Sequence, residues 1–126
     1  MSYKLFLDDE RKPSDVTWLE LPSGPWQIVR SYDAFAEYIS EHGIPDVISF
    51  DHDLGVENVE VVARSHDIDY NKLTMKTGYH CATWLANYCL DNQVQLPTFY
   101  VHSMNPVGAQ NIRVLLENFQ KFQNSQ

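Results

Sequence analysis

Residues 47–55, with the sequence VISFDHDLG, decide the fold that we expect for this chain. The first four form a short run rich in β-branched and aromatic residues, which is typical of a strand buried on both faces. An aspartate, a histidine and a second aspartate follow directly. The runs Tyr3 to Leu7 and Thr98 to Val101 have the same character, and each also leads into polar residues. The sequence therefore predicts buried strands whose ends carry polar side chains.

Helical patterns lie between these strands, together with a weaker strand signal. In each expected helix, apolar residues recur every three or four positions along one face. The expected elements are a strand from Trp26 to Arg30 and helices from Tyr32 to His42, from about Tyr79 to Asn92 with Thr77 as its cap, and from Pro106, fraying from Lys121 onward. Strands alternating with helices predict an α/β fold, with a parallel sheet covered on both faces and strand order 2-1-3-4.

Length and charge limit the classes of protein to which the chain can belong. Its 126 residues, 44% of them hydrophobic, suffice for one domain with its own core, and we expect a single domain over residues 1–126. The formal charge of −8 argues against non-specific binding of nucleic acid. The start, MSYKLFLDDE, fits neither a signal peptide nor a spanning helix, so we expect a cytoplasmic protein without membrane contact.

Two segments fit no regular element. They are Asp9 to Pro25, which contains three prolines, and Gly55 to Lys76, a long inserted loop whose alternating stretch VEVVARS is compatible with a hairpin. Loops of this size in compact domains usually carry function.

The chemistry concentrates where the strong strands end. In a parallel α/β sheet all carboxyl ends lie along one edge, where ligands bind. Polar residues distant in the sequence are therefore expected to share one crevice: Asp8, Asp9, Asp51, His52, Asp53, His102, Ser103 and Asn105.

Four carboxylates at this edge, Asp8, Asp9, Asp51 and Asp53, would repel one another strongly. A bound divalent cation relieves such repulsion, and oxygen ligands favour Mg²⁺, or Mn²⁺, over zinc. The alternative is that the acids cap helices or face solvent.

His52 and His102 are expected to move protons, because imidazole normally titrates near neutrality. Across a phosphodiester, one would deprotonate water and the other would protonate the leaving oxygen. The alternative for His52 is a structural role, with its side chain pointing away from the edge. Ser103 and Asn105 precede a helix whose first amides can bind phosphate, and Arg11 is the basic residue nearest a strand end. A solvated Arg11 and a simple Asn105 helix cap are the alternatives.

Four blocks, LFLDDERKP, VISFDHDLG, TGYHCATWL and HSMNPVGAQNI, occur in this order, and together they resemble the cyclic-phosphate processing receiver domain family. The resemblance implies a three-layer, receiver-like (flavodoxin-like) fold, here lacking the fifth strand of receivers. It implies that Asp8 and Asp9 bind metal and that Asp51 occupies the phosphoacceptor position. It also implies recognition or processing of cyclic phosphates, such as the 2′,3′-cyclic phosphate of a nucleotide or an RNA end.

Three hypotheses follow for the function. The first is a metal-dependent phosphoesterase, in which Asp51, His52 and His102 are catalytic while Ser103, Asn105 and Arg11 bind the phosphate. The second is a receiver-like signalling or interaction module without catalysis. The third is a protein that binds and sequesters cyclic nucleotides.

Overall fold

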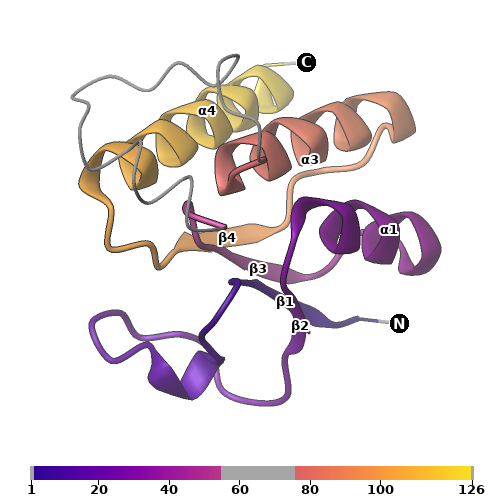
Figure 1. The fold of residues 1–126 in the computed structure, drawn as a ribbon. Coiled ribbons are helices and arrows are strands. Elements are labelled where there is room, and N and C mark those ends of the chain that lie inside the picture. Colours follow the sequence, from indigo (N-terminus) through magenta and orange to yellow (C-terminus); the bar gives the residue numbers. More distant parts are fainter. Residues whose placement is uncertain (1, 55–75, 126) are drawn as a thin grey trace.

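A computed structural model describes residues 2–54 and 76–125 of the chain. Within these ranges a parallel sheet has the strand order β2-β1-β3-β4 (Figure 1). The elements are, in chain order, β1 (Lys4–Leu7), the 3₁₀ helix η1 (Pro13–Asp15), β2 (Gln27–Val29), α1 (Tyr32–His42), β3 (Val47–Phe50), α3 (Gly78–Asn92), β4 (Thr98–Val101) and α4 (Pro106–Asn124). The predicted α/β class and strand order are confirmed.

The predicted helix starts are also confirmed, but one predicted end is wrong. Thr77 and Asn105 cap α3 and α4 through their side chains. The last helix does not fray from Lys121, because it continues to Asn124. The Gln123 side chain explains this, since it donates to the Val94 carbonyl at 2.9 Å and accepts from the Leu96 amide at 3.1 Å. The hairpin considered for VEVVARS lies outside the described residues.

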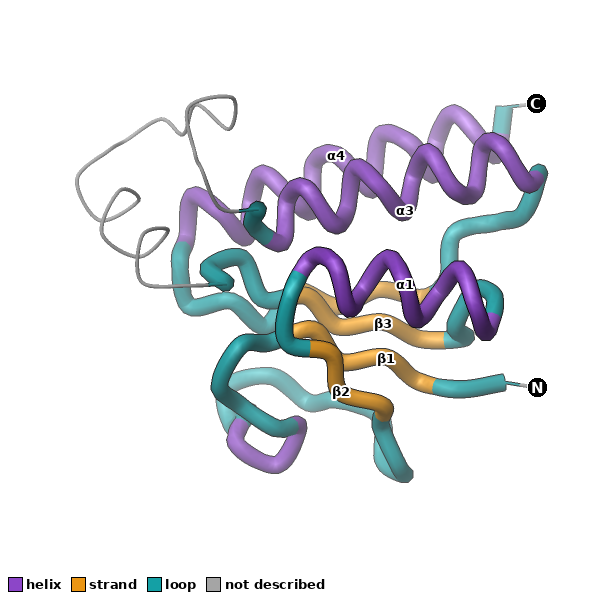
Figure 2. Tube along the Cα trace, turned by 45° about the vertical axis from the view of Figure 1, so that its right-hand side comes forward, coloured by secondary structure: helices purple, strands orange, loops and turns teal. Residues whose placement is uncertain are grey.

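The three described α-helices lie on the same face of the sheet, as two views show (Figures 1 and 2). Leu7, Phe50 and Val101 are paired across the strands, and their side chains point from that face into the core. Within this core, α1 packs on α3 and α3 packs on α4. The segment between β1 and β2, with η1, covers the opposite face. The expected third layer is therefore an irregular segment without an α-helix.

The irregular layer is attached to the sheet by aromatic residues. The Trp18 indole donates to the His102 carbonyl at 3.0 Å, and the Trp26 ring lies edge-on to Phe6 with centroids 6.1 Å apart.

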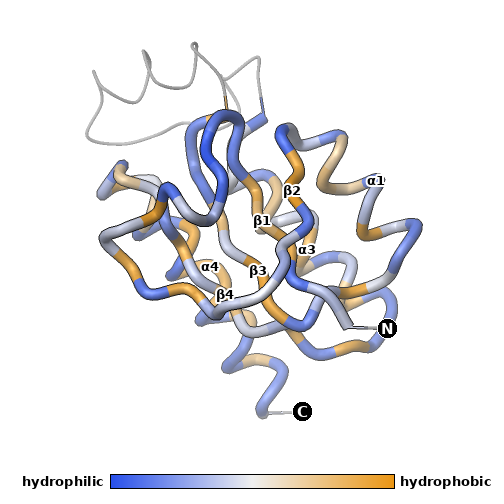
Figure 3. The backbone as a smooth tube through the Cα atoms, turned by 90° about the horizontal axis from the view of Figure 1, so that it is seen from below, coloured by the Kyte–Doolittle hydropathy of each residue, from blue (hydrophilic) through white to orange (hydrophobic). Residues whose placement is uncertain are grey.

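Figure 3 shows hydrophobic stretches along the strands and hydrophilic stretches in the connecting segments. Among the described helices, none is long and apolar enough to cross a membrane.

Two glycines allow the helix starts to approach the end of β3. A Cβ on Gly78 would lie 1.8 Å from the Asp51 carbonyl oxygen, and the Gly78 amide donates to the His52 carbonyl at 2.7 Å. A Cβ on Gly108 would lie 2.3 Å from Cγ of His52. Only glycine permits these approaches, so both helices are fixed against residues 51 and 52.

Replacing Gly108 by alanine is expected to destabilise the fold by about 1–3 kcal/mol, the usual effect of overpacking. This loss should occur although alanine is the better helix former by about 1 kcal/mol. Chemical unfolding of Gly108→Ala, His52→Ala and the double variant measures the coupling. The double variant should be more stable than the sum of the single effects predicts, because the ring that clashes is gone. Strict additivity would contradict the packing described.

Candidate functional site

The first residues after β1, β3 and β4 are Asp8, Asp51 and His102, and their side chains meet. Their backbone amides continue the sheet ladder, donating to carbonyls of the adjacent strands at 3.1, 2.9 and 3.0 Å respectively. One carboxylate oxygen of each aspartate and a ring nitrogen of the histidine all lie within 4.8 Å of one another. The exposed fractions are 0% for Asp8, 5% for Asp51 and 0% for His102. The predicted convergence of strand ends thus produces a buried cluster.

Asp8 is held by hydrogen bonds on both carboxylate oxygens. Oδ1 accepts from the amides of Glu10 and Arg11 at 2.9 and 2.8 Å, and Oδ2 lies 3.0 Å from Nε2 of His102. Burial alone would raise the pKa of Asp8, but the hydrogen bonds, first from His102 and then from the two amides, outweigh it and lower the pKa. Asp8 is therefore the ionised carboxylate of the cluster.

Asp51 is in the opposite electrostatic situation. Its Oδ1 accepts one hydrogen bond, from the His52 amide at 2.9 Å. Burial, followed by the negative charge of Asp8, raises the pKa of Asp51 to about 8. The same two causes, in the same order, raise the pKa of Asp9. This edge of the sheet thus holds more negative charge than its own hydrogen bonds balance, and a proton or a cation stabilises it.

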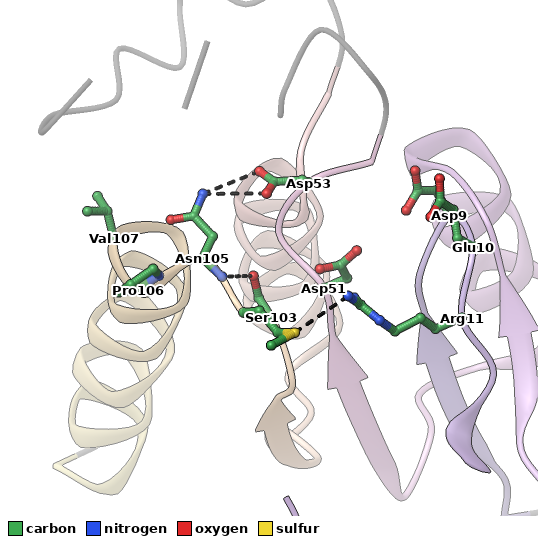
Figure 4. A pocket seen from close by; sticks show the side chains of 10 residues that line it. Asp9, Glu10, Arg11, Asp51, Asp53, Ser103, Asn105, Pro106 and Val107 are labelled. Atoms are coloured by element: carbon green, nitrogen blue, oxygen red, sulfur yellow. Dashed lines mark hydrogen bonds between the residues drawn. The ribbon is translucent and has the colours of Figure 1, made fainter. Parts of the chain in front are cut away.

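An open pocket of about 460 Å³ lies over this cluster (Figure 4). It is lined by the loops after β1, β3 and β4 and by the start of α4, namely Asp9, Glu10, Arg11, Asp51, Asp53, Ser103, Met104, Asn105, Pro106 and Val107. Arg11 extends across the pocket, with Nη2 3.6 Å from Sδ of Met104. Its guanidinium also lies over the Trp18 ring, 5.3 Å from the centroid. Arg11 is thus positioned to meet an anion entering the pocket.

The two histidines lie beneath this pocket and do not line it. Both are 0% exposed. His52 places Nδ1 2.8 Å from Oδ1 of Asp53, and His102 contacts Asp8. His52 therefore meets the pocket through Asp53, whereas Asp8, the partner of His102, does not line the pocket, and direct proton transfer to a ligand stays a prediction for both histidines.

Asn105 and Ser103 are at the pocket, as expected, but much of their hydrogen-bonding capacity is used locally. Oδ1 of Asn105 accepts from the Gly108 amide at 3.0 Å, while Nδ2 lies 3.4 Å from Oδ1 of Asp53. The Ser103 hydroxyl accepts from the Asn105 amide at 3.1 Å. Pro106 has no N–H, so among the first three residues of α4 only the Val107 amide is left for a phosphate.

Sequence reasoning did not single out Ser49, Met104 or Trp18, which the structure places beside the predicted residues. Ser49 is fully buried, and its hydroxyl lies 2.7 Å from Nδ1 of His102. The available signal was a polar residue inside the apolar run VISF. Met104 and Trp18 belong to loops, where no periodicity fixes the direction of a side chain.

Comparison with family models gives a match over most of the chain. The family model described as "Cyclic-phosphate processing Receiver domain" matches residues 3–118 of the chain. No curated protein and no solved structure matched in the corresponding searches.

The raised pKa of Asp51 predicts how stability depends on pH in metal-free protein. Between the ordinary pKa of 3.8 and about 8, the unfolded chain is ionised at Asp51 while the folded chain keeps the proton. Stability should therefore fall as pH rises through this window. Asp51→Asn removes this loss and should stabilise the protein by at least about 1 kcal/mol at pH 8, since one pKa unit corresponds to about 1.4 kcal/mol.

Urea unfolding at pH 5 and pH 8 in the presence of a chelator measures this effect. Asp91→Asn is the matched control, because Asp91 is exposed near the opposite end of α3. Parallel pH dependence in the wild type and Asp51→Asn would contradict the electrostatic description of the cluster.

Proposed function

Since this chain belongs to the cyclic-phosphate processing receiver domain family, we propose that it hydrolyses a cyclic phosphodiester in the pocket at the carboxyl edge of its sheet. The substrate class that we propose is the 2′,3′-cyclic phosphate of a nucleotide or of an RNA end. The observation that carries the proposal is the buried cluster of Asp8, Asp51 and His102, which lies under a pocket that Arg11 spans.

The cluster fits a divalent cation. Two carboxylates and one imidazole offer ligand atoms close enough to share one ion. The raised pKa of Asp51 indicates that a nearby positive charge would stabilise its ionised form. A mixed set of oxygen and nitrogen ligands suits Mn²⁺ better than Mg²⁺, which prefers oxygen alone. We propose that Asp8, Asp51 and His102 hold the ion, with Asp9 and Asp53 farther out. Such an ion, when bound, lowers the pKa of a bound water and offsets the phosphate charge.

Arg11 is the residue that we assign to the phosphate. Its guanidinium carries several donors in one plane, which matches two non-bridging phosphate oxygens. Among residues 2–54 and 76–125, the groups that these donors face are a thioether sulfur and an aromatic ring at the pocket, besides Asp8 at 3.7 Å. Neither the sulfur nor the ring competes strongly with an anion, so Arg11 can turn to the ligand at low cost.

Asp9 is the residue that we assign to proton transfer. It lines the pocket, and its raised pKa brings it closer to the range useful for acid–base catalysis. In the proposed step, water attacks phosphorus and Asp9 accepts its proton. The bond from phosphorus to one ribose oxygen breaks, and that oxygen receives the proton that Asp9 accepted from the water. His52 orients Asp53, and His102 is a ligand of the ion, which differs from the direct role in proton transfer that the sequence suggested for both histidines.

Hydrolysis of a 2′,3′-cyclic nucleotide in the presence of Mn²⁺ tests the proposal. The wild type should release a nucleoside monophosphate, and Asp8→Asn should reduce kcat by at least about 100-fold, because the ionised carboxylate of the cluster is lost. Asp91→Asn, at the far end of α3, should leave the rate unchanged. Product analysis by chromatography measures both.

The other hypotheses give different results in the same experiment. If the cyclic nucleotide binds tightly but is recovered intact, the protein sequesters the nucleotide and does not hydrolyse it. Stoichiometric labelling of Asp51 by a small acyl phosphate, without turnover of any cyclic phosphate, would indicate a signalling module.

Removing the Arg11 charge should weaken substrate binding. Arg11→Gln is expected to raise KM by about 10-fold or more, which corresponds to one charge-assisted contact. Lys12→Gln removes the same charge from the neighbouring, exposed residue and should change KM by less than about twofold. Equal effects of the two variants would show that only the overall charge matters.

A further inference from the structure

His102 uses both ring nitrogens inside the protein. Nε2 lies 3.0 Å from Oδ2 of Asp8, and Nδ1 lies 2.7 Å from the hydroxyl of Ser49. The ring stacks flat on Phe6, with centroids 4.4 Å apart and planes 6° from parallel. Phe6, Ser49 and His102 are all 0% exposed. The orientation of the ring is therefore fixed. Among the described residues, the Asp8 carboxylate and the Ser49 hydroxyl are the groups that can accept a hydrogen bond from the ring nitrogens.

Asp8 decides which nitrogen carries the proton when no cation is bound. An ionised carboxylate can only accept hydrogen bonds, and Oδ2 of Asp8 lies 3.0 Å from Nε2. Nε2 of a neutral ring must then be protonated and donate to Asp8. Nδ1 is left as an acceptor, and the Ser49 hydroxyl donates to it.

Coordination of a cation by His102 requires the opposite arrangement. The nitrogen that faces Asp8 is Nε2, and it can bind a cation only through its lone pair. The proton of the neutral ring then belongs on Nδ1, which must donate it. At this distance the acceptor is the Ser49 hydroxyl. Metal-bound histidines usually depend on such a partner at the other nitrogen.

We propose that Ser49 is a positioning residue whose hydroxyl reverses its hydrogen bond to His102 when a cation binds. Without the cation, the Ser49 hydroxyl donates to Nδ1; with the cation, it accepts from Nδ1–H. For a ring with one proton, the two states differ only in which nitrogen carries that proton, so no net proton is gained or lost. This inference rests on the proposed function, because it assumes a cation at Asp8, Asp51 and His102.

The hydroxyl suits this role for a simple reason. Of the small side chains, a hydroxyl both donates and accepts, and it can rotate between the two. Alanine would leave Nδ1 without a partner in either state, and an unsatisfied buried group of this kind is costly. Because the ring is already fixed by Phe6, loss of the hydroxyl should act on the proton position more than on the fold.

Nitrogen-15 NMR of the histidine rings at pH 8 tests the two states directly. In metal-free wild type, His102 should be protonated at Nε2 alone; with Zn²⁺, a diamagnetic substitute, it should be protonated at Nδ1. The His102→Asn variant identifies the signals. Protonation at Nδ1 without metal, or unchanged protonation at Nε2 with Zn²⁺ bound, would overturn the inference.

Calorimetric titration with Mn²⁺ measures the consequence for binding. Ser49→Ala should weaken the affinity by about 10-fold or more, and Ser49→Thr, which keeps the hydroxyl, should recover most of it. Tyr100→Phe is the control, since it removes a hydroxyl from the β4 residue paired with Ser49. Equal affinities of the wild type and Ser49→Ala would overturn the role of Ser49 alone. A wild type that binds no divalent cation would overturn the proposed metal site as well.

Discussion

The register of the parallel sheet is the constraint on which the site depends. Pairing of β1 with β3 and of β3 with β4 continues for one residue beyond the strands, so that Asp8, Asp51 and His102 emerge side by side at one edge. Because they belong to the ladder, they are buried, and their charges are poorly screened by water. A shift of one residue in any strand would turn its terminal side chain to the other face and remove it from the cluster.

Close contact between backbone and side chains holds this edge in place. The start of α3 rests on the Asp51 carbonyl, and the start of α4 rests on the His52 ring, at positions where only glycine fits. His52 in turn contacts Asp53, which Asn105 also reaches from the α4 cap. Packing and charge are therefore linked, because the residue under the glycine of α4 is also the partner of a pocket carboxylate.

The fold and the meeting of strand ends could be predicted from the sequence, because hydrophobic runs and the rule for parallel sheets are sufficient for both. Helix caps such as Thr77 were also predictable, since capping depends on local sequence. The burial of His52 and His102 and the contact of Ser49 could not be predicted, because they depend on packing between elements distant in the chain. The irregular character of the segment Asp9 to Pro25 was predicted, but its position over one face of the sheet was not, because a segment without periodicity does not indicate where it packs.

The burial of the histidines changes how the chemistry of this edge is understood. An imidazole at the pocket surface would be a proton shuttle, whereas one enclosed by Phe6, Ser49 and Asp8 is a ligand or an orienting group. The register extends the pair Phe50 and Val101 to Asp51 and His102, so the histidine, rather than Ser103, stands directly beside Asp51. If the cation that we propose binds there, a nitrogen ligand beside Asp51 would favour a metal-assisted reaction of a bound ester over the storage of a phosphoryl group on Asp51.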